Sequence, residues 1–197
     1  MKKKDLEMRL QKLRGFEDPD PSLEQYMTPA SIASDVLFIA YAENDIAGRN
    51  VIDLGCGTGI FSIGAWLLNA DSVHGIDVSP KAISVAKQNA EDVGADIVLD
   101  VRDISDVAMI ADTALMNPPF GCQNKRADRP FLDKAMDLCG SVYSLHMGRT
   151  TEFLEEYVRN AGREICFKKG YKFNIPHTFT FHNKANVDVD IVMIMIR

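Results

Sequence analysis

The chain has 197 residues, of which 46% are apolar and 25% charged, and this is enough for an α/β domain with a sizeable core. No apolar run reaches the roughly 18 residues that a membrane span needs, and the charged N-terminal segment lacks the apolar region of a signal peptide. The net charge of −6 argues against a nucleic-acid partner, yet the segment 121–184 holds 11 Lys and Arg against 7 Asp and Glu. The four cysteines are far apart and form no CxxC pair, so we expect a cytoplasmic protein with reduced thiols and no metal site.

The first predicted elements are two helices. Leucine recurs at helical spacing from Leu6 to Leu13, and the prolines of FEDPDPS end this helix. A second helix is expected over residues 28–42, with Thr28 as its N-cap and Pro29 at its first position.

From residue 50 onward, predicted strands alternate with predicted helices. The strands are expected at 50–55, 72–78, 95–101, 113–117 and 141–147. The helices are expected at 58–70, 79–94, 129–140 and 150–162. This alternation is typical of a parallel, doubly wound sheet, and the last two runs, 164–175 and 187–197, predict a closing antiparallel pair. We therefore predict an α/β fold of one domain over residues 1–197, with an N-terminal helical extension to residue 45 and a seven-stranded mixed sheet with helices on both faces.

The loop DLGCGTG, residues 53–59, joins the first predicted strand to a helix, where ligands bind in open α/β sheets. Its glycines, Gly55, Gly57 and Gly59, let the backbone turn tightly and approach a ligand. The spacing is GxGxG, which fits NAD less well than the GxGxxG of dinucleotide-binding proteins. Asp77 ends the next predicted strand, where a carboxylate can accept hydrogen bonds from both hydroxyls of a ribose. The pattern therefore favours a nucleoside-containing cofactor over a purely structural turn.

A second pattern, NPPF, ends the predicted strand at 113–117. Proline cannot donate to a strand ladder and Pro-Pro cannot continue a helix, so the strand stops at Asn117. The side-chain oxygen of Asn117 and the carbonyl of Pro118 can each accept one N–H from a planar amine, while Pro119 keeps the loop rigid. Phe120 can stack on a base turned out of its helix. NPPF thus predicts a pocket for a flat amine or amide.

The run VIDLGCGTG, followed by GIDVSPKAI, resembles motifs one and two of the class I S-adenosylmethionine-dependent methyltransferases. The resemblance implies a Rossmann-like fold with S-adenosylmethionine as cofactor and the glycine loop against its methionine part. It also implies that Asp77 holds the ribose, that Asp103 meets the adenine amine, with Asp100 as the alternative, and that Ile104 flanks the adenine ring. NPPF resembles the (Asp/Asn)-Pro-Pro-(Tyr/Phe) motif of enzymes that methylate planar amino groups.

The segments LEQYMTP, NPPFG, VYSLH and FHNK together resemble the METTL5-like family over nearly the whole chain. This family methylates an adenine N6 in small-subunit ribosomal RNA, and the resemblance implies that substrate and a small zinc-binding activator protein as partner. The catalytic residues would be Asn117, Pro118, Pro119 and Phe120. The cofactor-binding residues would be Gln25, Thr28, Asp53, Gly55, Gly57, Thr58, Gly59, Asp77, Asp103 and Ile104. Contacts to RNA are expected from Lys125, Arg126, His182 and Lys184.

Three other functions stay open. Methylation of a protein glutamine, for example on a translation factor, would use the same motif because a glutamine amide is also planar. Those enzymes commonly carry an N-terminal recognition domain, whereas about 45 residues precede the core here. Guanine-N2 methylation often comes with a duplicated domain, and this chain has none. A non-catalytic cofactor-binding subunit usually loses the glycine loop or the NPPF tetrad, and both are intact.

Overall fold

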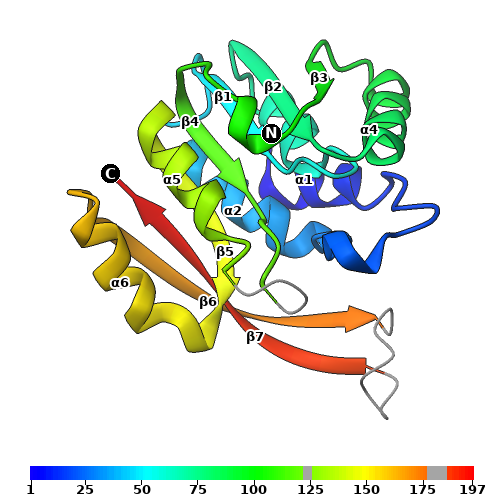
Figure 1. Cartoon of the computed structure of the whole chain (residues 1–197). Helices are drawn as coiled ribbons and strands as arrows, with labels where there is room; N and C mark the ends of the chain where they lie inside the picture. The colour runs from blue at the N-terminus through cyan, green and yellow to red at the C-terminus, as the bar shows by residue number, and fades with distance from the viewer. Residues whose placement is uncertain (122–125, 177–185) are drawn as a thin grey trace.

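The computed structural model describes residues 1–121, 126–176 and 186–197 (Figure 1). The strands are β1 (Asn50–Leu54), β2 (Ser72–Asp77), β3 (Val98–Val101), β4 (Ala111–Met116), β5 (Cys139–Met147), β6 (Ile165–Pro176) and β7 (Asn186–Ile196). The helices are α1 (Lys3–Leu10), α2 (Ala30–Ala42), α3 (Ile60–Leu67), α4 (Pro80–Val93), α5 (Arg129–Leu138) and α6 (Thr151–Asn160). Short 3-10 helices are η1 (Pro21–Leu23), η2 (Ile104–Asp106) and η3 (Gly148–Thr150).

The strands form one seven-stranded sheet in the order β3-β2-β1-β4-β5-β7-β6. Strands β1 to β5 run parallel, and β7 pairs antiparallel with both β5 and β6. The mixed sheet and its closing antiparallel pair confirm the predicted fold class. Leu54 at the end of β1 pairs with Met116 at the end of β4, so the glycine loop and the NPPF segment leave the sheet side by side. This shared edge positions the site.

Helices cover both faces of the sheet (Figure 1). On one face, α1, α2 and α3 pack in a buried cluster that includes Val51 of β1 and Leu115 of β4. On the other face, α5 and α6 pack over Ile52 and Ala114, the neighbours of those residues in the chain. Successive residues of a strand point to opposite faces of the sheet. Both sets of residues include buried apolar side chains in β1 and β4, as is usual for parallel strands buried on both sides. Within the described ranges, no helix combines the length and the apolar character needed to cross a bilayer.

The start of α2 differs from the prediction. The helix begins at Ala30 with Pro29 as its N-cap residue, and no side chain caps it, so the prediction of Thr28 as N-cap was wrong. The carbonyl of Pro29 accepts the N–H groups of Ile32 and Ala33, and the Thr28 hydroxyl is instead engaged by the amide of Asn117. A tertiary hydrogen bond has therefore replaced the local cap that the sequence pattern indicates.

Candidate active site

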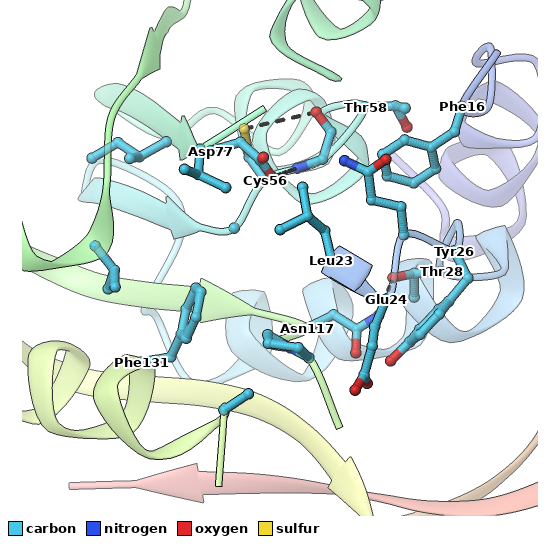
Figure 2. A pocket seen from close by; sticks show the side chains of 18 of the residues that line it. Phe16, Leu23, Glu24, Tyr26, Thr28, Cys56, Thr58, Asp77, Asn117 and Phe131 are labelled. Carbon is cyan, nitrogen blue, oxygen red and sulfur yellow. Dashed lines mark hydrogen bonds between the residues drawn. The ribbon is translucent and has the colours of Figure 1, made fainter. Parts of the chain in front are cut away.

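A cavity of about 400 Å³ lies at the carboxyl ends of β1, β2 and β4, and its volume is in the usual range for small-molecule sites. Figure 2 shows side chains that line it. The glycine loop forms one wall, and the start of α5 forms another. Residues 16–28, which we call the N-terminal strap, lie across it through Phe16 and residues 22–28. The predicted site residues that line the cavity are Gln25, Thr28, Gly55, Gly57, Thr58, Asp77, Asp103, Ile104, Asn117 and Pro119.

The glycine loop requires its glycines for two reasons. Gly55, Gly57 and Gly59 all have positive φ, between 55° and 89°. A Cβ on Gly57 would lie 2.9 Å from the ring of Phe16, and one on Gly55 would lie 3.1 Å from the ring of Phe131. The loop is a backbone surface fitted closely between two aromatic side chains.

Asp77 ties the end of β2 to this loop. Its Oδ2 accepts the N–H of Gly57 at 2.9 Å, and its Oδ1 accepts the N–H of Ser79 at 2.8 Å. Burial raises the pKa of the Asp77 carboxyl, and backbone N–H groups of Ser79, Gly57 and Val78 oppose that shift. Each carboxylate oxygen keeps a lone pair for a further donor, so Asp77 can accept ribose hydroxyls as expected from its place in the sequence.

Asp53, the first residue of the glycine loop, does not line the cavity. Its Oδ2 accepts the N–H and the O–H of Ser62 in α3, at 2.9 and 2.6 Å. Its Oδ1 is buried and has no hydrogen-bond partner in the part of the chain that the structure describes. Burial raises the pKa of Asp53 to about 7. Gly59, at the other end of the loop, also lies outside the cavity lining, and the cofactor-binding role expected for these two residues stays a prediction.

Asp103 and Ile104 line the cavity after β3, whereas Asp100 does not. The Oδ1 of Asp103 accepts the N–H and the O–H of Ser105, at 2.9 and 2.7 Å, and these bonds lower the pKa of Asp103. Asp100 instead contacts Nε2 of His74 at 2.8 Å. Of the two acids that the sequence offers near the adenine position, the geometry favours Asp103.

Asn117 has the most informative hydrogen bonding in the site. Its Nδ2 donates to the Thr28 hydroxyl at 2.9 Å. Its Oδ1 is buried and accepts no hydrogen bond from any described residue. Buried side-chain oxygens nearly always have a partner, so this one marks the position of a missing donor. Asn117 and Thr28 lie in one wall of the cavity in Figure 2.

The other members of the NPPF segment differ in exposure. Pro119 lines the cavity and Pro118 is buried without lining it. The ring of Phe120 is only 8% exposed and packs against Tyr26 of the strap, with ring centroids 5.3 Å apart. In this conformation Phe120 belongs to the core, and its expected stacking on a base stays a prediction.

The expected RNA contacts are only partly placed. Arg126 is exposed just before α5 and has a left-handed backbone, with φ of 70°. Lys125, His182 and Lys184 lie outside the described residues. The strap supplies what the sequence did not indicate: Phe16 packs on the glycine loop, and Glu24 is buried in the cavity wall with φ of 51°. No motif marks these two residues, because each depends on how the strap folds back over the sheet.

Comparison with known proteins identifies the family of this chain. A family model described as ribosomal protein L11 methyltransferase (PrmA) matches residues 36–116. The chain is 36% identical to the rRNA N(6)-adenosine-methyltransferase METTL5 of Danio rerio, over 97% of this chain and 96% of that protein. The chain belongs to the METTL5-like family. Its Drosophila melanogaster member, rRNA N(6)-adenosine-methyltransferase Mettl5, is 33% identical over 97% of this chain and 94% of its own length.

A solved structure of similar sequence has nearly the same fold. The crystal structure of PH1948 from Pyrococcus horikoshii, described as a candidate RNA methyltransferase, superposes with a TM-score of 0.94 at 37% identity. The superposition covers 100% of this chain and 97% of that one. The protein is thus an S-adenosylmethionine-dependent methyltransferase with the class I fold.

The residues present fit that cofactor. The cavity runs from the carboxyl ends of β2 and β3, where Asp77 and Asp103 offer carboxylates, to the end of β4. Gly55 and Gly57 also line the cavity, so the loop offers backbone without side chains to a ligand. At the far end, the buried Oδ1 of Asn117 can accept a hydrogen bond from a ligand, because no described residue donates to it.

Proposed function

We propose that this protein methylates the N6 amine of an adenine in RNA, with ribosomal RNA as the substrate that its relatives' names favour. The observation that carries the proposal is the buried, unpartnered Oδ1 of Asn117 at the end of β4. An acceptor of this kind, held by the rigid Pro-Pro that follows it, suits the N–H of a planar amine.

In this proposal the residues of the chain orient the substrate amine toward the methyl group. S-adenosylmethionine supplies a methyl group on a positively charged sulfur. The adenine amine is a weak nucleophile because its lone pair is delocalised into the ring. Asn117 Oδ1 accepts one N–H, and the Pro118 carbonyl accepts the other, which draws the nitrogen toward tetrahedral geometry and directs its lone pair. The amine loses its proton to solvent after it has become cationic, so no strong general base is required.

The match to the PrmA family model does not favour protein methylation. It ends at Met116, one residue before NPPF, and so it covers the half of the sheet that holds the cofactor loop. The segment that receives the substrate amine lies outside it. A glutamine amide offers the same pair of N–H donors, so the experiment below also looks for glutamine methylation.

The activator protein that the family resemblance implies has a suitable place at the β3 edge. Strand β3 is the last strand on its side of the sheet. Val98 and Val101 in it are about half exposed. An open edge flanked by exposed apolar side chains is a site for strand addition. We propose that the activator covers this edge, and Val98→Lys with Val101→Lys would then abolish co-purification without changing cofactor binding.

The proposed function is tested by product analysis. The protein, with and without the activator, is incubated with labelled S-adenosylmethionine, unmodified small-subunit ribosomal RNA and a glutamine-containing release-factor domain. Mass spectrometry of digested RNA is expected to show N6-methyladenosine, and the Asn117→Ala variant is expected to show none. Label on the protein substrate alone, or N2-methylguanosine in the RNA, would overturn the proposal.

A further inference from the structure

An arginine and two aromatic rings form a stacked group outside the cavity, which we call the platform: Arg129, Phe153 and Tyr157. The guanidinium of Arg129 lies 4.5 Å from the centroid of Phe153 and 5.6 Å from that of Tyr157. The two ring centroids are 5.4 Å apart. The hydroxyl of Tyr157 donates to Asp133 at 2.7 Å, which fixes that ring. Arg129 begins α5 and the rings belong to α6, so two helices hold the group in place.

The platform lies at the edge of the sheet that carries the NPPF segment. Arg129 directly precedes Pro130, and Pro130 and Phe131 line the cavity. Helix α6 follows β5, whose Ser144 pairs with Met116 next to Asn117. Figure 1 shows the first turns of α5 and α6 at the end of the sheet where β4 and β5 finish. A nucleic acid that presents a base to Asn117 would therefore pass close to the platform.

The charges around the platform suit an RNA strand. In the described part of the chain, neither Arg129 nor the exposed Arg126 and Arg149 form an ion pair, whereas Arg14 and Arg102 on other surfaces do. Arg126 and Arg149 are exposed just before α5 and α6, where their guanidinium groups can contact phosphates. The exposed Glu152 and Glu156 make the patch less basic, which favours stacking of a base over binding of phosphate alone.

The platform is open to solvent on one side, because Phe153 is 39% exposed. One face of the Arg129 guanidinium covers the ring, and a planar guanidinium has a second face on which a base can stack. We propose that the platform stacks an unpaired base that neighbours the target adenine, with Arg126 and Arg149 on the flanking phosphates. This inference rests on the proposed RNA methylation and names how that substrate is held.

The test compares Phe153→Ala with Phe167→Ala, because Phe167 on β6 is similarly exposed at 41%. The affinity for a single-stranded RNA fragment containing the target adenine is measured in S-adenosylhomocysteine at several salt concentrations. Loss of a stacked base is expected to weaken binding about tenfold for Phe153→Ala, with an unchanged salt slope. Phe167→Ala is expected to bind RNA as wild type does, and both variants are expected to keep wild-type affinity for S-adenosylhomocysteine.

Arg129 gives a second, independent readout. Arg129→Ala is expected to weaken RNA binding and to reduce the salt slope by about one, while Arg129→Lys restores the slope but not the affinity, because lysine has no planar face to stack. Arg159→Ala, at the opposite end of α6, is the control and is expected to have no effect. Wild-type affinity in Phe153→Ala, or full rescue by Arg129→Lys, would overturn the platform while leaving RNA methylation intact. A wild-type protein that binds no RNA would overturn both proposals.

Discussion

The side-chain amide of Asn117 donates to the hydroxyl of Thr28 across 2.9 Å, joining the end of β4 to a residue 89 positions earlier in the chain. Because Thr28 accepts the N–H, the opposite side of the amide presents its oxygen. That oxygen is the buried acceptor assigned to the substrate amine. Thr28 was expected to contact the cofactor, and its hydroxyl proton is still available for that contact.

Replacement of Thr28 distinguishes these two roles. In Thr28→Val the Asn117 amide loses its acceptor and can rotate, so kcat is expected to fall about tenfold, the effect of one buried hydrogen bond. Thr28→Ser keeps the hydroxyl and is expected to retain most of the activity. Cofactor affinity, measured by calorimetry, is expected to fall less than kcat in Thr28→Val and to stay near wild type in Thr28→Ser. A large loss of cofactor affinity with normal kcat would show that Thr28 serves the cofactor alone.

The role of Asp77 predicts a pH dependence of cofactor binding. Burial raises its pKa, and the ionised carboxylate is the form that accepts both ribose hydroxyls. Cofactor affinity is therefore expected to fall as the pH is lowered through that raised pKa. Asp77→Ala is expected to weaken binding by about 1.5–3 kcal/mol at neutral pH and to remove this dependence. An unchanged dissociation constant in Asp77→Ala would exclude a contact with the ribose.

Asp53 predicts a pH dependence of stability instead. Its pKa is about 7 in the folded protein against 3.8 for the free side chain, so between these values the folded state binds more protons than the unfolded state. This group therefore contributes to the free energy of unfolding below pH 4, and that contribution is lost as the pH rises toward 7. The loss is on the order of 2–4 kcal/mol. Urea unfolding of Asp53→Asn against wild type isolates the effect. Parallel stability curves for the two proteins across pH 4–8 would contradict it.

The glycine loop offers a matched pair of substitutions. Gly57 and Gly94 both have positive φ, at 55° and 73°, but only at Gly57 would a Cβ meet a neighbour, the ring of Phe16. Gly94→Ala is expected to cost about 1 kcal/mol of unfolding free energy and to leave cofactor binding unchanged. Gly57→Ala is expected to displace Phe16 and weaken cofactor binding as well. Equal cofactor affinity in both variants would show that Phe16 does not shape the cofactor site.

Local patterns in the sequence were sufficient for most of the fold. Ser79 accepts the N–H of Ala82 as the N-cap of α4, with Pro80 in the first turn, as its sequence indicates. The alternation of apolar runs with helical patterns likewise predicts the parallel sheet and its closing antiparallel pair. These signals depend on neighbours within a few residues, and such neighbours are visible in the sequence.

Contacts between distant segments account for the rest. Thr28 was predicted to cap α2, but a hydrogen bond to β4 holds its side chain. Asp53 was expected to bind the cofactor, which stays a prediction, and its carboxylate accepts two hydrogen bonds from Ser62 of α3 that no motif indicates. Phe16 lines the cavity only because the strap crosses the sheet edge, and no spacing in the sequence encodes that crossing. Motif analysis therefore identifies a site more readily than the geometry within it.

The central claim is that Asn117 orients the substrate amine and does not hold the cofactor. The most direct test is single-turnover methylation of RNA by the Asn117→Ala variant, with its cofactor dissociation constant measured alongside. The account predicts a rate of N6-methyladenosine formation lower by about 100-fold or more, the usual effect of removing one oriented polar group, and nearly unchanged cofactor affinity. A rate near that of wild type, or a loss of rate matched by an equal loss of cofactor affinity, would contradict it.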